Sequence, residues 1–138
     1  MYLIDTNVIS EARKGAKANI GVLQFFHQVE MDGKPVYISA ITIGELRRGV
    51  DLIFHRGDKL QSKQLNDWLM LILEEYQSQV LNIDSEIAML WGKLRVPHPE
   101  NALDKLIAAT ALIYDLTLVT RNAKDFTSTG VKLLNPFE

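Results

Sequence analysis

Four acidic residues stand where an apolar run ends or a helix appears to begin. Asp5 follows the run YLI, and Glu45, Asp104 and Asp125 lie in the segments TIGE, NALD and NAKD. Carboxylates packed together raise one another's pKa values unless a cation compensates. Because the chain has no cysteine and its three histidines lack metal-ligand spacing, hard oxygen donors of this kind suit Mg²⁺ or Mn²⁺ rather than zinc.

A carboxylate-bound metal predicts one kind of chemistry. Two such ions, about 3.5–4 Å apart, can orient a water molecule and stabilise the charge that grows on a phosphodiester during in-line displacement. The pattern therefore predicts hydrolysis of a nucleic-acid backbone.

Each acid also has a structural alternative. Asp5 has the position of an ordinary helix N-cap, and the other three each stand three residues after a Thr or Asn that could cap a helix. Thr42 and Glu45 have the spacing of a capping box. Asp104 fits this alternative less well, because aspartate reaches back less easily than glutamate and its helix is the most apolar in the chain. Capping stays open for Glu45 and Asp125.

The elements that must position these acids follow from the hydrophobic pattern. Apolar segments of strand length alternate with segments of helical periodicity, which predicts an α/β fold with a mainly parallel, helix-covered sheet of about five strands. In such a sheet, ligands bind beyond the C-terminal ends of the strands, where Asp5 falls. The expected strands are Tyr2–Ile4, Val36–Ser39, Val80–Ile83, Thr117–Thr120 and Val131–Leu134, and the expected helices are Thr42–Phe54, Leu60–Tyr76, Glu86–Leu94 and Ala102–Tyr114.

Composition excludes several classes of protein. The 138 residues, 47% apolar and 23% charged, are typical of one soluble domain. No apolar run is long enough to span a membrane, no basic region precedes the first apolar run, and the lack of cysteine favours the cytoplasm. The net charge of −2 argues against a nucleic-acid partner when taken as a whole, but without the four acids 15 basic residues would face 13 acidic ones.

The chain resembles a known family at several motifs. LIDTNVIS, ISAITIGELRRGV, DKLIAATALIYDLTLVTRN and the following KDF resemble a PIN domain, in particular the VapC-type, FitB-like toxins, from Tyr2 to about Asn135. The resemblance implies one PIN domain over residues 1–138 with a three-layer α/β/α fold. It also implies an Mg²⁺-dependent endoribonuclease, inhibited by a cognate VapB-type antitoxin and usually dimeric.

The resemblance assigns roles to individual positions. Asp5, Asp104 and Asp125 would hold the metal, while Glu45 would complete the site or position the attacking water. Asn7, Thr120 and Asn122 match polar positions that flank the acids. One departure is Lys105, where a small or apolar residue is expected; it would face solvent, pair with Asp104 or contact RNA phosphate.

Other basic and apolar groups have possible roles in binding. Arg13, Lys14, Arg47 and Arg48 are candidate phosphate contacts. Residues 50–76 hold more apolar side chains than one buried stripe requires. They form either two core-packed helices or an exposed face for a second copy or an antitoxin helix.

Three rival functions compete with the nuclease. A haloacid-dehalogenase-type phosphatase needs a D-x-D pair, but Asn7 occupies the second acidic position. A receiver-type phosphoacceptor domain needs paired acids and a late strand-end lysine, which VTRN does not supply. The third rival is a catalytically weak PIN-fold subunit that binds nucleic acid mainly within an antitoxin complex.

Overall fold

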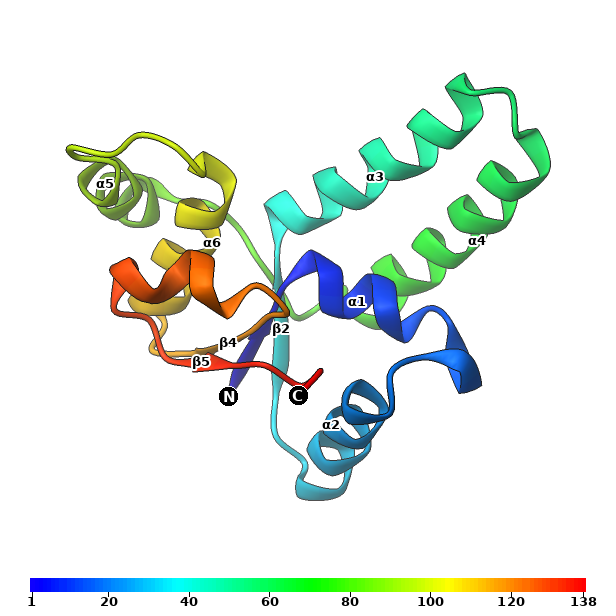
Figure 1. Cartoon of the computed structure of the whole chain (residues 1–138), viewed down its shortest axis with the longest axis horizontal. Coiled ribbons are helices and arrows are strands. Elements are labelled where there is room, and N and C mark those ends of the chain that lie inside the picture. Colours follow the sequence, from blue (N-terminus) through cyan, green and yellow to red (C-terminus); the bar gives the residue numbers. More distant parts are fainter.

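The protein, described as a computed structural model that covers residues 1–138, has five strands in one all-parallel sheet. The order across the sheet is β3-β2-β1-β4-β5 (Figure 1). The strands are β1 Tyr2–Ile4, β2 Val36–Ser39, β3 Val80–Leu81, β4 Thr117–Val119 and β5 Leu133–Leu134.

Six α-helices connect and cover the strands. Several have clear start and stop signals: the Asn19 side chain accepts hydrogen bonds from the first turn of α2, and Gly33 ends that helix at φ 64°, where glycine has no Cβ penalty. The helices are α1 Thr6–Ala12, α2 Ile20–Asp32, α3 Ala40–His55, α4 Lys59–Glu75, α5 Ser85–Leu94 and α6 Ala102–Ile113, with 3₁₀ helices η1 Gly15–Lys17 and η2 Ala123–Thr129.

The side chains of β1 alternate between two hydrophobic cores, as the pleat of a strand requires. Ile4 packs into a core shared with helices α1 to α4, whereas Leu3 packs into a second core with α6 and η2. A third, smaller cluster joins α5 to α6. The predicted α/β architecture is therefore confirmed, with the sheet between two helical layers and every strand pair parallel.

The element boundaries differ from the predictions in several places. Strands β3 and β5 are each two residues long, because the chain leaves the sheet after Leu81 and joins it only at Leu133. Helices α1 and α2 were not predicted, because their mixed polar and apolar residues surround the charged segment near Arg13. Helix α3 begins at Ala40, capped by Ser39, two residues before the expected start.

The order of the strands places a crevice at the end of β1. From this central strand, the chain runs outward through β2 and β3 on one side and through β4 and β5 on the other. The connections leave in opposite directions, so a switch point lies between β1 and β4, the usual position of a ligand site in open parallel sheets. Asp5 directly follows β1, and Thr120 directly follows β4.

Helices α3 and α4 form a hairpin that projects from the body of the molecule (Figure 1). It exposes large apolar side chains, including Phe54, Leu60 and Leu71, each more than half exposed. The other faces of both helices are in the core, through Leu46, Val50 and Leu69. No helix in the structure has the length and apolar composition needed to cross a membrane.

Candidate functional site

Asp5 is a buried carboxylate with three hydrogen-bond donors. It is 5% exposed, and it accepts from the Thr120 hydroxyl at 2.7 Å, the Thr6 backbone N–H at 2.8 Å and the Asn7 side-chain amide at 3.3 Å. Burial raises the pKa of Asp5 above its usual value, against the opposing effect of these three donors. It is also the N-cap of α1, so the structural and functional interpretations apply to the same side chain.

The donors to Asp5 are themselves held in place. The Asn7 side-chain oxygen accepts from the backbone N–H of Arg121 at 3.1 Å, and the Thr120 hydroxyl accepts from the backbone N–H of Asn122 at 3.1 Å. Of the three predicted flanking residues, Asn7 and Thr120 contact Asp5 with their side chains. Asn122 contributes its backbone.

Glu45 reaches the site from α3. Its carboxylate accepts a hydrogen bond from the Thr6 hydroxyl at 3.0 Å, so Thr6 joins two of the predicted acids through its backbone and its side chain. Burial raises the pKa of Glu45, and the charge of Asp5 raises it further, while the Thr6 hydroxyl lowers it. Thr6 was not among the predicted site residues, although its place inside the DTN motif was a signal for it.

Asp104 lies in the first turn of α6, one turn before Ile107 and Ala108, which belong to the second core. Burial and then the charges of Asp5, Asp125 and Glu45 raise the pKa of Asp104 to about 6. The topology agrees with these couplings, because Asp5, Glu45 and Asp125 follow the C-terminal ends of β1, β2 and β4, and Asp104 lies near the start of the helix that leads back to β4. The fold therefore brings the four predicted acids to one edge of the sheet.

Asp125 lies on the exposed side of η2, whose Phe126 is buried against α6. Its backbone N–H donates to the carbonyl of Asn122 at 2.9 Å. Its carboxylate has no hydrogen-bond partner in the chain and contributes to the site through its charge on Asp104.

Of the four acids, only Asp5 caps a helix. The predicted Thr42–Glu45 capping box is absent, because Ser39 caps α3 with its own hydroxyl and Thr42 is already helical. The Thr42 hydroxyl is instead buried without a partner. The helices that carry Asp104 and Asp125 begin at asparagines that make no side-chain cap hydrogen bond.

One of the three roles suggested for Lys105 was to face solvent, and the structure contradicts it. Lys105 is 8% exposed, and its ammonium group donates to the backbone carbonyl of His98. Nor does it form an ion pair with Asp104. The lysine instead ties the loop that precedes α6 to that helix.

The candidate phosphate contacts are scattered. Lys14 is paired with Glu11 at 2.9 Å, and Arg47 is paired with Asp51 at 2.8 Å. Arg48 is exposed and makes no ion pair, whereas Arg13 borders a groove described below.

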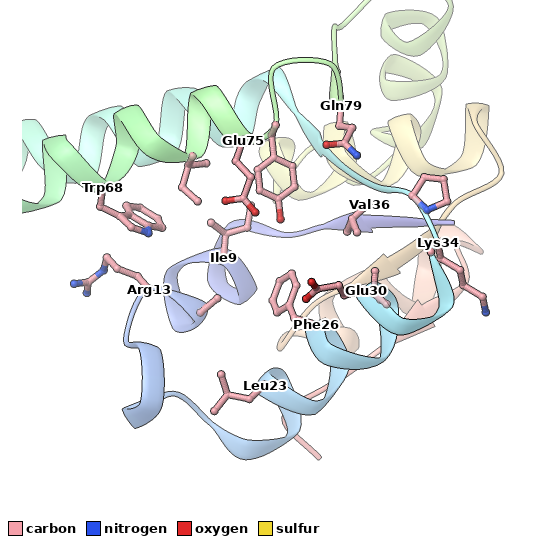
Figure 2. Close-up of a pocket in the computed structure, with 16 residues that line it drawn as sticks. Ile9, Arg13, Leu23, Phe26, Glu30, Lys34, Val36, Trp68, Glu75 and Gln79 are labelled. Atoms are coloured by element: carbon pink, nitrogen blue, oxygen red, sulfur yellow. The ribbon is translucent and has the colours of Figure 1, made fainter.

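A groove of about 730 Å³ lies between α1, α2 and α4 (Figure 2). Its floor is mostly apolar, with Ile9, Phe26 and Trp68 among its lining residues, and charged groups such as Arg13 and Glu30 lie among them. None of the four acids lines it. The groove is thus distinct from the acidic site, although Ile9 of α1 lines it and Asp5 caps the same helix.

The sequence matches the PIN domain family over residues 2–132. The chain belongs to the PIN-domain family. It is 34% identical over 143 residues to Toxin FitB of Neisseria gonorrhoeae, covering 99% of both chains, and 29% identical over 143 residues to VapC ribonuclease Y4jK of Sinorhizobium fredii, covering 100% of this chain and 99% of the other. Within the PIN family it groups with the VapC- and FitB-like toxins of toxin–antitoxin systems.

Solved structures agree with this grouping. The chain superposes on the crystal structure of FitAcB from Neisseria gonorrhoeae with a TM-score of 0.85 at 33% identity, covering 100% of this chain and 99% of the other. It superposes equally on FitAB bound to an IR36 DNA fragment, with a TM-score of 0.85 at 30% identity, 100% of this chain and 96% of the other. The resemblance stated from the motifs is confirmed.

Proposed function

We propose that this chain, a single PIN domain over residues 1–138, is the cytoplasmic toxin of a VapBC-type toxin–antitoxin pair. Its activity is that of a metal-dependent endoribonuclease, which hydrolyses phosphodiester bonds of RNA with a metal-activated water. The observation that carries the proposal is the set of four carboxylates at the C-terminal edge of the sheet, where the Thr120 hydroxyl and the Asn7 amide hold Asp5. A domain that only binds nucleic acid gains nothing from acids that repel phosphate.

The donor set fits Mg²⁺ or Mn²⁺ in its chemistry. Its members are carboxylates, with no cysteine and no histidine among them, and their repulsion has no cation in the chain to relieve it. No three acidic or histidine side chains converge closely enough to form a finished metal site. Asp5, Asp104 and Asp125 would hold the ion, directly or through water.

Asp5 and Glu45 have different roles in the proposed reaction. Asp5 is fixed by Thr120 and Asn7, so its carboxylate keeps one orientation toward the crevice. Glu45 would accept the proton of the attacking water, a role supported by its hydrogen bond from Thr6 and by a pKa that burial raises. A bound metal would supply the lowered pKa of that water and stabilise the charge on the scissile phosphate.

The test is cleavage of a panel of structured and single-stranded RNAs with Mg²⁺, Mn²⁺ or EDTA. Asp5→Asn and Asp104→Asn are the informative variants, because asparagine still caps α1 and both substitutions keep side-chain size. Asp67→Asn, on the exposed face of α4, is the matched control. We expect metal-dependent cutting by the wild type and the control and at least a hundredfold loss in both site variants; equal cutting by all four proteins would refute the assignment.

The partner we propose is a VapB-type antitoxin, and the groove of Figure 2 is the surface that fits it. An apolar floor with interspersed charges suits an amphipathic peptide segment. Because Trp68 lines the groove and the only other tryptophan is Trp91 on α5, binding there should change the fluorescence of a Trp91→Phe protein. An antitoxin that binds without any fluorescence change would exclude this surface.

We also propose that the protein is a homodimer. The apolar side chains on the projecting hairpin of α3 and α4 are the observation that favours self-association. Light scattering over a range of concentrations tests it, and a monomer at the highest concentration would contradict it.

The rival function, a catalytically weak nucleic-acid-binding subunit, would show RNA or DNA binding that Asp104→Asn does not change.

A further inference from the structure

Arg121 is fixed beside the acidic site through both of its peptide groups. Its backbone N–H donates to the Asn7 side chain, which in turn donates to Asp5, and its carbonyl accepts from the Asn135 side-chain amide at 3.2 Å. It also directly follows Thr120, the strongest side-chain partner of Asp5. The position of its backbone is thus tied to that of the acids.

The side chain of Arg121 is held by an aromatic ring, with its donors left unused. The centre of its guanidinium lies 4.8 Å from the centroid of the Phe137 ring. The residue is exposed, and the guanidinium has neither an ion pair nor a hydrogen-bond acceptor within the chain. A guanidinium over a ring keeps the N–H groups along its edges free, in the planar arrangement that matches two phosphate oxygens.

The C-terminal segment that carries Phe137 is itself anchored. Figure 1 shows this segment passing from β5 toward α2, and the backbone N–H of Phe137 donates to the Asn135 side-chain oxygen at 3.0 Å. Phe137 packs against the core shared by α1 to α4. At α2, a Cβ on Gly21 would lie 2.0 Å from the carbonyl oxygen of Pro136, so the segment docks where only glycine leaves room for it.

The neighbouring acid Glu11 leaves the Arg121 guanidinium without an ion pair, so it is free to bind an anion. Glu11 on α1 has a lowered pKa, caused first by Lys14, then by the backbone N–H of Asn19, and only weakly by Arg121. Its carboxylate is paired with Lys14 at 2.9 Å, so it does not neutralise Arg121. A polyanionic substrate that approaches four carboxylates needs a nearby cation, and the backbone of Arg121 is linked to Asp5 through Asn7.

We infer that Arg121 binds a backbone phosphate of the RNA next to the scissile one, with its guanidinium oriented by the ring of Phe137. The inference rests on the proposed ribonuclease function and adds a substrate-binding residue to it. Arg121 is a direct contact, and Phe137 is a positioning residue that acts through it. A phosphate contact carries no base preference, so it contributes to affinity for every RNA sequence.

The test is steady-state cleavage of a labelled single-stranded RNA in Mg²⁺ between about 50 and 300 mM KCl. The variants are Arg121→Gln, Arg121→Lys, Phe137→Leu and Phe137→Trp. The matched control is Arg56→Gln, which removes an exposed arginine at the far end of the α3–α4 hairpin. Thermal melts show that each protein is folded before its kinetics are compared.

We expect Arg121→Gln to raise KM about tenfold with kcat nearly unchanged, and to make the salt dependence of log(kcat/KM) shallower by about 0.7, the value for one phosphate on a single strand. Arg121→Lys should keep the wild-type salt slope. Phe137→Leu should raise KM several-fold, and Phe137→Trp should restore it, because tryptophan also stacks on a guanidinium. Arg56→Gln should behave as the wild type.

The outcomes separate this inference from the proposed function. If the wild type cleaves and Asp104→Asn does not, but Arg121→Gln keeps the wild-type KM and salt slope, the phosphate contact is refuted and the nuclease stands. A fall in kcat with an unchanged salt slope also refutes it, since the Arg121 side chain would then affect the chemical step without binding a phosphate. A wild type without metal-dependent cleavage overturns both.

Discussion

Replacing Asp104 with asparagine should stabilise the metal-free protein at neutral pH. A carboxyl whose pKa is raised from 3.8 to about 6 loses about 3 kcal/mol of folding free energy when it is ionised, at about 1.4 kcal/mol per pKa unit. Because the side chain is only partly buried, solvent screening reduces this to about 1–2 kcal/mol. For a chain of this size, the gain corresponds to a rise in Tm of about 4–8 °C.

The pH dependence of this gain has a definite sign. The folded protein holds the Asp104 proton more tightly than the unfolded chain does, so the ionisation penalty is absent below about pH 4 and develops as the pH rises through 6. Urea unfolding in EDTA at pH 4 and pH 7.5 measures it. The difference between Asp104→Asn and the wild type should be near zero at the lower pH and about 1–2 kcal/mol at the higher one.

Adding Mg²⁺ should reverse the order of stability. A ligand that binds only the folded state stabilises in proportion to its occupancy, and the wild type with all four acids should gain more than the variant. Asp67→Asn, which removes one partner of an exposed pair, should stay within about 0.5 kcal/mol of the wild type at both pH values. Clear destabilisation by Asp104→Asn at pH 7.5 without metal would refute the reasoning, since the carboxylate would then support its helix.

Three further substitutions test the contacts around the site. Thr120→Val removes the 2.7 Å donor to Asp5 and should cost about 1–3 kcal/mol in urea unfolding while raising the Mg²⁺ concentration needed for cleavage; an unchanged metal requirement would argue against an orienting role. Gly21→Ala should cost about 1–3 kcal/mol, because its Cβ would meet the carbonyl of Pro136, and equal stability would mean that the C-terminal segment yields freely. Lys105→Met should speed hydrogen exchange in the loop before α6, and unchanged protection there would show that the buried ammonium does not hold the loop.

The fold was predictable where one physical signal dominated. The alternation of apolar strands with amphipathic helices indicated a parallel sheet, and Ile4 and Leu3 do pack on its opposite faces. Boundaries were less predictable. Ser39, rather than Thr42, caps α3, because the strand ends one residue before the helix starts and the first available hydroxyl takes the cap.

The contacts of the site depended on distances that local patterns do not encode. The spacing of the acids suggested their convergence, but the link from Asp5 to Glu45 through Thr6 needed the packing of α1 against α3. Lys105 is the clearest case. A lysine in an apolar helix suggests an exposed or paired charge, whereas here the partner is a main-chain carbonyl of a loop, which no side-chain pattern records.

The strand order also determines when the acidic site can assemble during synthesis. Asp5 is made 115 residues before its hydroxyl partner Thr120, and β1 stays open along one edge until β4 pairs with it. Asp104 and Asp125 also belong to the last quarter of the chain. A nascent chain on the ribosome therefore has no assembled acidic site, and a prematurely terminated one never acquires it.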